Sequence, residues 1–408
     1  MIMIIIINEK DRWNLMAKYF FSSSFLLFLG NWIGQVGLNW FVLTTYHNAV
    51  YLGLVNFCRL IPILLLSVWA GSIADKYDKG LLLRITITSS FIITALLCLL
   101  TYSLNSIPIF IILLYATFRG ILSAVETPVR QAVLPDLSSK ISTTQAVSFH
   151  SFIINICRSI GPAIAGGLIA VYHTPTTFLA QAVCYFIAAV LCIPVHFEVI
   201  VSQKEEKALP LKVVLNYFKS NLEGSQIFIT SIIIMATGFS YTTVLPVLTN
   251  HIFPGQSQVF GIAMTFCAIG GIVATIVLPS ILKHLSTVKM YYLSSILFGI
   301  ALLGIIIHHL VVMFICITLI GLFSQWARTT NRVYFQHSVK DCDRGKVLSI
   351  IMMDRGMIPL GSLIMSFFAD MFGILTTFTI MGICTISISL IFYIIQRISN
   401  MEESNNES

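Results

Sequence analysis

Residues 51–80 read YLGLVNFCRLIPILLLSVWAGSIADKYDKG, an apolar block followed by a short charged loop. An apolar helix of about 20 residues spans the roughly 30 Å of hydrocarbon in a bilayer, so this block predicts a transmembrane helix. Similar blocks fill the 408-residue chain, which is 57% hydrophobic and only 10% charged. A soluble globular protein carries about 25% charged residues, and an outer-membrane barrel alternates polar and apolar residues over segments of about ten. The sequence therefore predicts an all-α integral membrane protein.

The apolar blocks predict twelve transmembrane helices. The first six are expected at 20–45, 51–73, 84–104, 107–128, 143–172 and 176–197. The second six are expected at 225–248, 257–282, 289–307, 309–329, 346–370 and 373–396. A polar linker over 198–224 separates an N-terminal six-helix bundle (1–197) from a C-terminal one (225–397), which ends in a tail over 398–408. The short loops leave no room for a separate soluble domain.

The Lys and Arg residues predict how these helices are oriented. Most of the 24 lie before the first span, in the linker and in every second loop. The intervening loops contain none: 46–50, 105–106, 173–175, 249–256, 308–309 and 371–372. Because cytoplasmic loops carry the excess of Lys and Arg, we expect both termini and the linker in the cytoplasm. The net charge of +7 then orients helices and does not indicate nucleic acid as a partner.

The sequence shows no sign of catalysis or of a bound cofactor. The nine Cys lie mostly inside apolar blocks without paired spacing, which predicts neither disulfides nor a metal site. A Gly-x-x-x-x-Gly-Lys-Ser/Thr phosphate loop and a His-Glu-x-x-His zinc motif are both absent from the sequence. We therefore expect neither an enzyme nor an ATP-driven pump.

A weak internal repeat relates the two halves. Arg158 precedes Pro162 by four residues, and Arg355 precedes Pro359 by the same distance. Both elements lie in the predicted fifth span of their half, and they are almost half the chain apart. Two repeated bundles of helices are typical of secondary transporters, which alternate between inward- and outward-open states.

The loop after the second span carries a family motif. Gly71–Gly80 reads GSIADKYDKG and resembles the signature loop of the major facilitator superfamily, Gly-x-Leu-Ala-Asp-Arg-x-Gly-Arg-Arg/Lys. The resemblance implies the twelve-helix major facilitator fold and a latch that closes its cytoplasmic side. It departs from the motif at Asp78, where Gly is usual, and at Gly80, where a cation is usual, and these departures affect the turn.

Spans four and five resemble the drug and siderophore exporter branch of this superfamily, which includes enterobactin and macrolide exporters. The similarity rests on the run from Arg119 to Asp136 and on Gly161-Pro162 followed by Gly166-Gly167, which is similar to the exporters' antiporter motif. The glycine pair is shifted, and Cys157 stands where an upstream Gly is common. From both motifs we expect these gating residues: Gly71, Asp75, Lys79, Glu126, Arg130, Gly161 and Pro162.

Four cations lie inside the predicted spans: Arg59, Arg119, Arg158 and Arg355. A charge at the bilayer centre costs at least about 2.5–3.5 kcal/mol, so these side chains are expected to face the interior of the bundle. Polar residues at helical spacing accompany them. We expect the substrate to contact Asn31, Gln35, Arg59, Tyr115, Arg119, Asn155, Arg158, Tyr241 and Arg355. The alternatives are hydrogen bonds between helices for the polar residues and structural ion pairs for the arginines.

The charges favour an anionic substrate. Arg119 and Arg158 are expected together at the midplane beneath Asn31 and Gln35, and the middle of the first half offers no acid for a lipophilic cation. Arg suits carboxylates, and among substrates of the family polycarboxylate or catecholate siderophores fit best. The sequence thus predicts a proton-coupled exporter of a metal-free, anionic siderophore, acting as a monomer in the bacterial cytoplasmic membrane with Asp354 as the proton carrier.

Two other functions remain open at this point. The same machinery would serve a multidrug or macrolide efflux antiporter. If the direction of transport were reversed, the same machinery would serve proton-coupled uptake of a siderophore or another organic anion.

Overall fold

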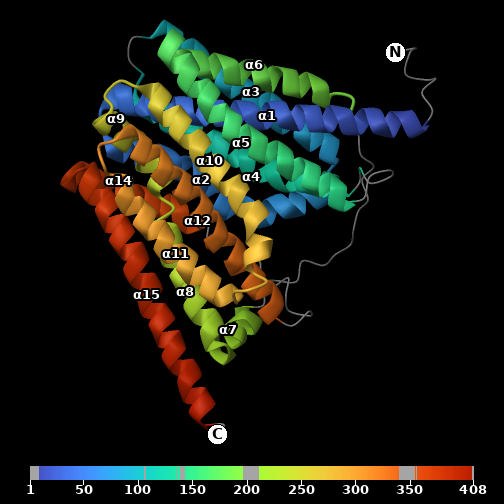
Figure 1. The fold of residues 1–408 in the computed structure, drawn as a ribbon. Helices are drawn as coiled ribbons and strands as arrows, with labels where there is room; N and C mark the ends of the chain where they lie inside the picture. The colour runs from blue at the N-terminus through green and yellow to red at the C-terminus, as the bar shows by residue number, and fades with distance from the viewer. Residues whose placement is uncertain are drawn as a thin grey trace. The chain divides into compact units, whose positions relative to one another are not determined.

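The computed structural model describes residues 9–104, 107–135, 137, 143–195, 211–339, 354 and 356–406 (Figure 1). The described residues form helices and connecting turns and contain no strand. The first six helices are α1 (Glu9–Tyr46), α2 (Ala49–Lys76), α3 (Lys79–Ser103), α4 (Ile109–Val133), α5 (Thr143–Tyr172) and α6 (Pro175–Cys192). The next four are α7 (Leu211–Ser220), α8 (Leu222–Thr237), α9 (Tyr241–Ile252) and α10 (Ser257–Ile281). The last four are α11 (Thr287–Gly304), α12 (Leu310–Ser338), α14 (Met357–Phe372) and α15 (Ile374–Asn406).

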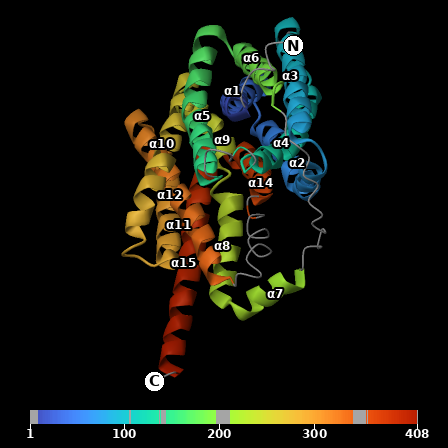
Figure 2. The same ribbon diagram turned by 90° about the vertical axis from the view of Figure 1, so that its right-hand side faces the viewer.

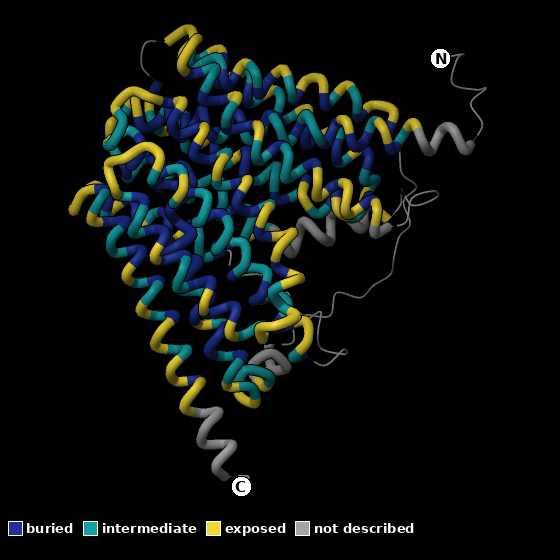
Figure 3. Tube along the Cα trace, viewed as in Figure 1, coloured by how far each residue is buried: buried dark blue, intermediate teal, exposed yellow. Residues whose placement is uncertain are grey.

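The helices are of membrane-spanning length and composition. Within the described residues eleven spans are long and apolar enough to cross a bilayer, α8 and α9 counting as one, and the shorter apolar helix α14 accompanies them. Exposed positions recur along the helices (Figure 3), and many of them carry large apolar residues. On α3, for example, Ile85, Ile92 and Leu99 are exposed, whereas Ser90 and Thr94 are buried. An apolar outside and a polar inside are what a bundle in lipid requires. The predicted all-α, twelve-helix architecture is confirmed.

The predicted seventh span is broken. α8 ends at Thr237 and α9 begins at Tyr241, because the Phe239 amide donates to the Ile234 carbonyl at 3.1 Å and so widens the turn by one residue. Pro246 follows inside α9, where it has no amide hydrogen to offer. Membrane helices accept such breaks when neighbouring groups satisfy the backbone.

Two other helices differ from the sequence prediction. α12 continues to Ser338, nine residues beyond the predicted end, because Asn331 and its neighbours are partnered inside the fold although hydropathy marks them as a loop. α7 lies in the predicted linker. Phe218 of α7 stacks on Phe228 of α8 at 4.8 Å, and the Tyr217 hydroxyl lies 2.7 Å from the Ser338 hydroxyl of α12.

Packing divides the chain into two compact units. Unit 1 comprises 1–47, 58–204 and 256–265, and unit 2 comprises 48–57, 205–255 and 266–408. The start of α2 belongs to unit 2 because a Cβ at Gly53 would lie 2.6 Å from the Ser366 Cβ of α14. The start of α10 belongs to unit 1 for the same reason, since a Cβ at Gly261 would lie 2.5 Å from the Pro162 carbonyl oxygen. The predicted bundles 1–197 and 225–397 are each continuous in sequence, whereas these units are made of several segments. The predicted boundaries stay a prediction.

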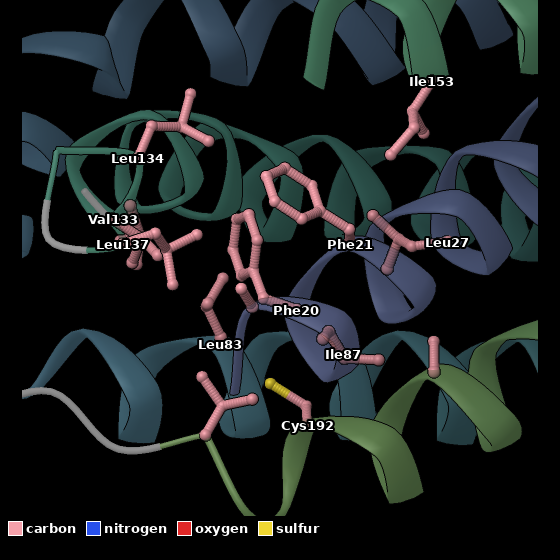
Figure 4. Packing of buried hydrophobic residues seen from close by; sticks show 14 of the residues in the cluster. Phe20, Phe21, Leu27, Leu83, Ile87, Val133, Leu134, Leu137, Ile153 and Cys192 are labelled. Atoms are coloured by element: carbon pink, nitrogen blue, oxygen red, sulfur yellow. The ribbon is translucent and has the colours of Figure 1, made fainter. Parts of the chain in front are cut away.

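Unit 1 is built around α1, which packs on α5 and α6 (Figure 2). Its core joins Phe20 and Phe21 of α1 to Leu83 of α3, Val133 of α4 and Cys192 of α6 (Figure 4). A Cβ at Gly34 would overlap the Gln181 side chain, so α1 approaches α6 closely along this face. That contact fixes the rotation of α1 about its axis and leaves its Asn31 and Gln35 positions for another neighbour.

Unit 2 has an aromatic core. Tyr291 and Tyr292 of α11 pack with Ile227 of α8 and with Tyr334 and Phe335 of α12. Beside this cluster, Glu223 of α8 accepts hydrogen bonds from the Tyr334 hydroxyl at 3.0 Å and from the Gln396 amide of α15. The polar contacts join the ends of α8, α12 and α15.

Candidate functional site

Unit 1 contains a cavity of about 250 Å³ among α1, α2, α4 and α5. Its polar lining comes from all four helices: Asn31, Gln35, Arg59, Arg119, Ser123, Glu126, Thr127, Arg130, Gln131 and His150. Leu27, Phe28, Leu60, Ile63 and Ile154 complete the lining. The α4 residues recur every three or four positions, so one face of that helix supplies most of the charge.

Close backbone packing brings the two arginines at the centre together. A Cβ at Gly120 would overlap the carbonyl oxygen of Arg59, so only glycine lets α4 approach α2 at this level. Arg119 directly precedes Gly120 and lines the same cavity as Arg59. Two guanidinium groups therefore share one small space, and their mutual repulsion favours an anion between them.

Arg119 is held in place from behind. Its Nε and Nη2 donate to the Tyr185 hydroxyl at 3.1 and 2.7 Å, and its Nη1 donates to the Ser123 hydroxyl at 3.0 Å. Gln181 Nε2 donates to the same Tyr185 oxygen at 3.0 Å, and the Tyr115 hydroxyl donates to Gln181 Oε1 at 3.3 Å. The chain of hydrogen bonds is buried and fixes the guanidinium before any ligand arrives.

Arg130 and Glu126 form a buried ion pair one turn apart on α4. Arg130 Nε donates to Glu126 Oε1 at 2.8 Å, and Arg130 Nη1 donates to the Ser24 hydroxyl of α1 at 2.7 Å. The guanidinium lies 5.7 and 5.9 Å from the ring centres of Phe20 and Phe28. Glu126 Oε2 also lies 3.9 Å from Arg119 Nη1. The described lining thus has three arginines and one carboxylate, an excess of positive charge.

The structure brings some predicted binding residues together and leaves others apart. Asn31, Gln35, Arg59 and Arg119 all line the cavity, and Tyr115 stands behind it through Gln181. Arg158 and Asn155 of α5 are not among the lining residues. Arg158 lies one turn beyond Ile154 and its Nε is buried without a partner in the described structure, while Asn155 Nδ2 donates to the Ser151 carbonyl. Arg59 is therefore the cation that lines the cavity with Arg119, and the substrate contact expected of Arg158 stays a prediction.

The predicted residues of the second half lie in unit 2. The Tyr241 hydroxyl is 3.0 Å from Cys267 Sγ. Asp354 Oδ2 accepts hydrogen bonds from the Ser231 hydroxyl at 2.7 Å and from Asn331 Nδ2 at 3.3 Å. Arg355 lies outside the described residues.

The predicted latch is described in part. Gly71 and Asp75 lie at the end of α2, and their side chains fall outside the described part of the chain. Lys79 Nζ donates to the Ala132 carbonyl of α4 at 3.1 Å. Asp78 accepts a hydrogen bond from the Gly80 amide at 2.7 Å and thereby caps α3, which explains why an acid serves at this turn.

The predicted gate in span five is a close helix contact. A Cβ at Gly161 would lie 2.6 Å from the Trp32 Cβ of α1. The neighbouring Pro162 carbonyl faces Gly261 of α10. Any larger residue at Gly161 would push α5 away from α1.

Residues 16–408 match the model of a family described as "Transmembrane secretion effector". The chain belongs to this family of the major facilitator superfamily. It is 75% identical over 394 residues to the Staphyloferrin A transporter of Staphylococcus aureus, covering 96% of this chain and 99% of that protein. It is 19% identical over 406 residues to Macrolide efflux protein A of Streptococcus pyogenes, covering 97% and 99%.

Solved structures share the fold. The nucleoside transporter NupG superposes with a TM-score of 0.74 at 15% identity, covering 93% of this chain and 98% of that one. A POT family transporter in complex with 5-aminolevulinic acid superposes with a TM-score of 0.70 at 14% identity, covering 93% of this chain and 95% of that one. The protein is a multi-pass membrane transporter and not an enzyme, and the predicted superfamily and exporter-type relatives are confirmed.

Sequence reasoning missed several residues of this transporter's cavity. Tyr185 and Gln181 lie four apart on α6, where they resemble ordinary core residues, and only the tertiary contact shows that they hold Arg119. His150 lies on α5, eight residues before Arg158, and faces the cavity. His150 lies four residues before Ile154 and therefore on the same face of α5, and this spacing is the sequence feature that could have placed it at the cavity.

Proposed function

We propose that this transporter exports a metal-free, anionic siderophore across the bacterial cytoplasmic membrane. One observation carries the proposal: Arg59, Arg119 and Arg130 line a small cavity in which Glu126 is the single carboxylate among the described residues. The relative at 75% identity is named for staphyloferrin A, and the family for secretion, and both names support the proposal.

The cavity is suited to carboxylates. Arg presents paired N–H donors in a plane, and Tyr185 and Ser123 already fix the Arg119 plane, so little side-chain entropy is lost on binding. Arg59 approaches from the facing helix, and Asn31 and Gln35 offer amide groups for neutral parts of the ligand. An anion bound here would exchange sides as the transporter alternates between inward- and outward-open states.

Proton coupling and topology complete the proposal. Arg does not titrate in proteins, so the proton needs another carrier. Asp354 is a buried carboxyl of unit 2 whose described hydrogen bonds come from the neutral donors Ser231 and Asn331. The positive-inside pattern supports a cytoplasmic location for both termini. We propose that the transporter acts as a monomer, with protons and the siderophore as its partners within the lipid bilayer.

The latch residues are proposed to close the cytoplasmic side. Lys79 reaches the α4 carbonyl of Ala132, two residues from Arg130, so the loop after α2 contacts the end of the helix that carries the binding arginines. We expect Asp75→Asn to reduce the transport rate while the amount of protein in the membrane stays near normal. Wild-type transport by Asp75→Asn would exclude this role.

The direct test is a deletion strain grown without iron. Mass spectrometry of medium and cell contents should show siderophore retained in the cells and depleted from the medium, and expression of the wild-type chain should reverse this. Inverted membrane vesicles measure the direction of transport and its coupling to protons. Energised vesicles should accumulate metal-free staphyloferrin A, and an uncoupler should abolish this accumulation. Accumulation of the iron complex by right-side-out vesicles would establish uptake instead.

Macrolide efflux is the second candidate, because Macrolide efflux protein A aligns over almost the whole chain. The two functions differ in the charge of the ligand. Purified transporter should bind metal-free staphyloferrin A and ignore cationic dyes and macrolides. Tight binding of those cations with no binding of the siderophore would put drug efflux in its place.

A further inference from the structure

Of the described residues that line the unit 1 cavity, His150 alone carries an imidazole. It is 5% exposed, and its Nδ1 is buried without a hydrogen-bond partner in the described structure. The ring lies between two phenylalanines of α1, with centroids 6.1 Å from Phe20 and 5.4 Å from Phe28. Buried polar groups are ordinarily paired, so an unpaired nitrogen on a ring that lines a cavity indicates a partner that arrives from outside.

The charged groups around His150 come from the neighbouring helices. α4 presents Arg119, Glu126 and Arg130 to the same cavity, and α2 presents Arg59. α1 adds the two phenyl rings and neutral amides, and α5 itself adds Ile154. Glu126 is already engaged by Arg130 at 2.8 Å, so the net field at His150 is that of the arginines.

This field favours a neutral imidazole while the cavity is empty. A nearby positive charge disfavours the protonated ring, and so does burial. A bound carboxylate changes the sign of the field, because it neutralises the arginines and offers an acceptor to Nδ1. The imidazolium form donates from both nitrogens, whereas the neutral ring donates from only one.

We propose that His150 takes up a proton from solvent when an anion binds in the cavity, and donates it as a hydrogen bond from Nδ1 to a ligand carboxylate. No covalent bond changes in this step: water loses the proton and the imidazole gains it. The inference rests on the proposed function only in that the cavity binds an anion. It makes His150 a specificity residue, which selects ligands whose carboxylate reaches Nδ1. The proton stays on the imidazole, so the net charge of the occupied cavity becomes one unit more positive while the charge of the ligand itself is unchanged.

The sign of the pH dependence follows. The bound state holds more protons than the free state, so anion affinity rises as the pH falls. The change is at most about tenfold per pH unit, for one linked proton, within the range in which the free cavity has lost the proton and the bound one keeps it.

The test is isothermal titration calorimetry of the purified, full-length transporter in buffers of different ionisation enthalpy. The probes are metal-free staphyloferrin A and citrate, each measured between about pH 5.5 and pH 8.5. Plotting observed enthalpy against buffer enthalpy gives the number of protons taken up per anion. We expect about one for the wild type and close to none for His150→Gln, after subtracting the protons that the ligand itself gains.

Two further variants control the measurement. His284→Gln removes an exposed imidazole in the turn between α10 and α11 and should match the wild type. His150→Arg places a permanent cation at the site and should bind the anion with no pH-dependent contribution from the protein, which keeps the test available if His150→Gln fails to fold.

The outcomes separate this inference from the proposed function. Binding of staphyloferrin A with equal proton uptake by wild type and His150→Gln would overturn the inference and leave the function standing. Binding of citrate alone, with the expected proton difference, would support the inference and overturn the siderophore. Failure of both anions to bind would overturn both.

Discussion

The two units place similar polar networks in corresponding helices, but they compensate charge differently. In unit 1, Ser24 of α1 meets Arg130 of α4, and the acid Glu126 lies on the same helix as the arginine. In unit 2, Ser231 of α8 meets Asn331 of α12. Asn331 lies as far from the start of α12 as Arg130 lies from the start of α4. There the acid is Asp354, which comes from the chain just before α14.

The difference assigns different tasks to the two acids. Glu126 is held as an anion by a guanidinium at 2.8 Å, so neutralising it would leave a buried cation unpaired. Asp354 receives its hydrogen bonds from a hydroxyl and an amide, which also suit a protonated carboxyl. We therefore expect unit 1 to bind the anion, with the linked proton uptake of His150, and unit 2 to carry the proton that drives transport. Four comparisons test this division.

The largest effect is expected from Asp354→Asn. The amide fills the same volume and keeps the contacts with Ser231 and Asn331, but it carries no titratable proton. Accumulation of siderophore against its gradient in energised vesicles should fall to background, while downhill exchange persists. Glu126→Gln is the matched control and should slow accumulation without uncoupling it. Unchanged accumulation by Asp354→Asn would remove this residue from the mechanism.

The next largest effect concerns stability. Arg130→Ala removes the nearest charge partner of the buried Glu126 and leaves it only Arg119, at 3.9 Å, which should lower the free energy of unfolding by about 3–5 kcal/mol. Asn331→Ala, at the corresponding place in unit 2, removes neutral hydrogen bonds and should cost about 1–3 kcal/mol. Unfolding in mixed micelles measures both. The double variant Arg130→Met/Glu126→Leu should recover most of the loss, and equal losses from the two single variants would show that charge is not the difference.

A smaller effect is expected on ligand affinity. Arg119→Gln removes one charged contact with the anion, a loss of about 1.5–3 kcal/mol, or roughly ten- to hundredfold in affinity, and Arg119→Lys should restore part of it. Arg158→Gln is the comparison. The sequence predicts a similar loss, whereas Arg158 is not among the cavity residues, so we expect less change. If Arg158→Gln lost as much affinity in equilibrium binding as Arg119→Gln, the binding site would extend along α5 to Arg158.

Sequence reasoning reached the spans, the family and part of the cavity for identifiable reasons. Apolar blocks fix membrane spans almost without regard to tertiary structure, and a cation inside such a block has few places to go, which is why Arg59 and Arg119 could be predicted to face inward. The spacing of Glu126 and Arg130 is a local feature and shows in the sequence.

The remaining features depend on tertiary packing. Tyr185 reaches Arg119 from another helix, and no spacing within α6 reveals this. Asn331 has the polarity of a loop residue, and only its contacts with Ser231 and Asp354 explain why α12 continues past it. The turn after Thr237 depends on how Gly238 packs against Phe298, since a Cβ there would lie 2.7 Å from that ring.

The smallest expected effect concerns the residues that cap the first turn of a helix in each unit. Asp78 caps α3 of unit 1, and Asn221 caps α8 of unit 2 by accepting from the Gly224 amide at 2.7 Å. Replacing either by Ala should lower the free energy of unfolding by about 1 kcal/mol. Asp78→Gly restores the residue usual in the family's loop and should cost only a few tenths of a kcal/mol, because glycine is also tolerated at this position.

The charge of Asp78 adds little to this effect. Its carboxylate lies 3.9 Å from Arg84, and both side chains are about a quarter exposed, so the ion pair is screened by solvent. Asp78→Asn should therefore keep most of the cap, apart from the modest attraction between a carboxylate and a helix N-terminus. Thermal unfolding of the three Asp78 variants and of Asn221→Ala ranks their losses of stability. If Asp78→Asn lost as much stability as Asp78→Ala, the contribution would come from the negative charge and not from the capping hydrogen bond.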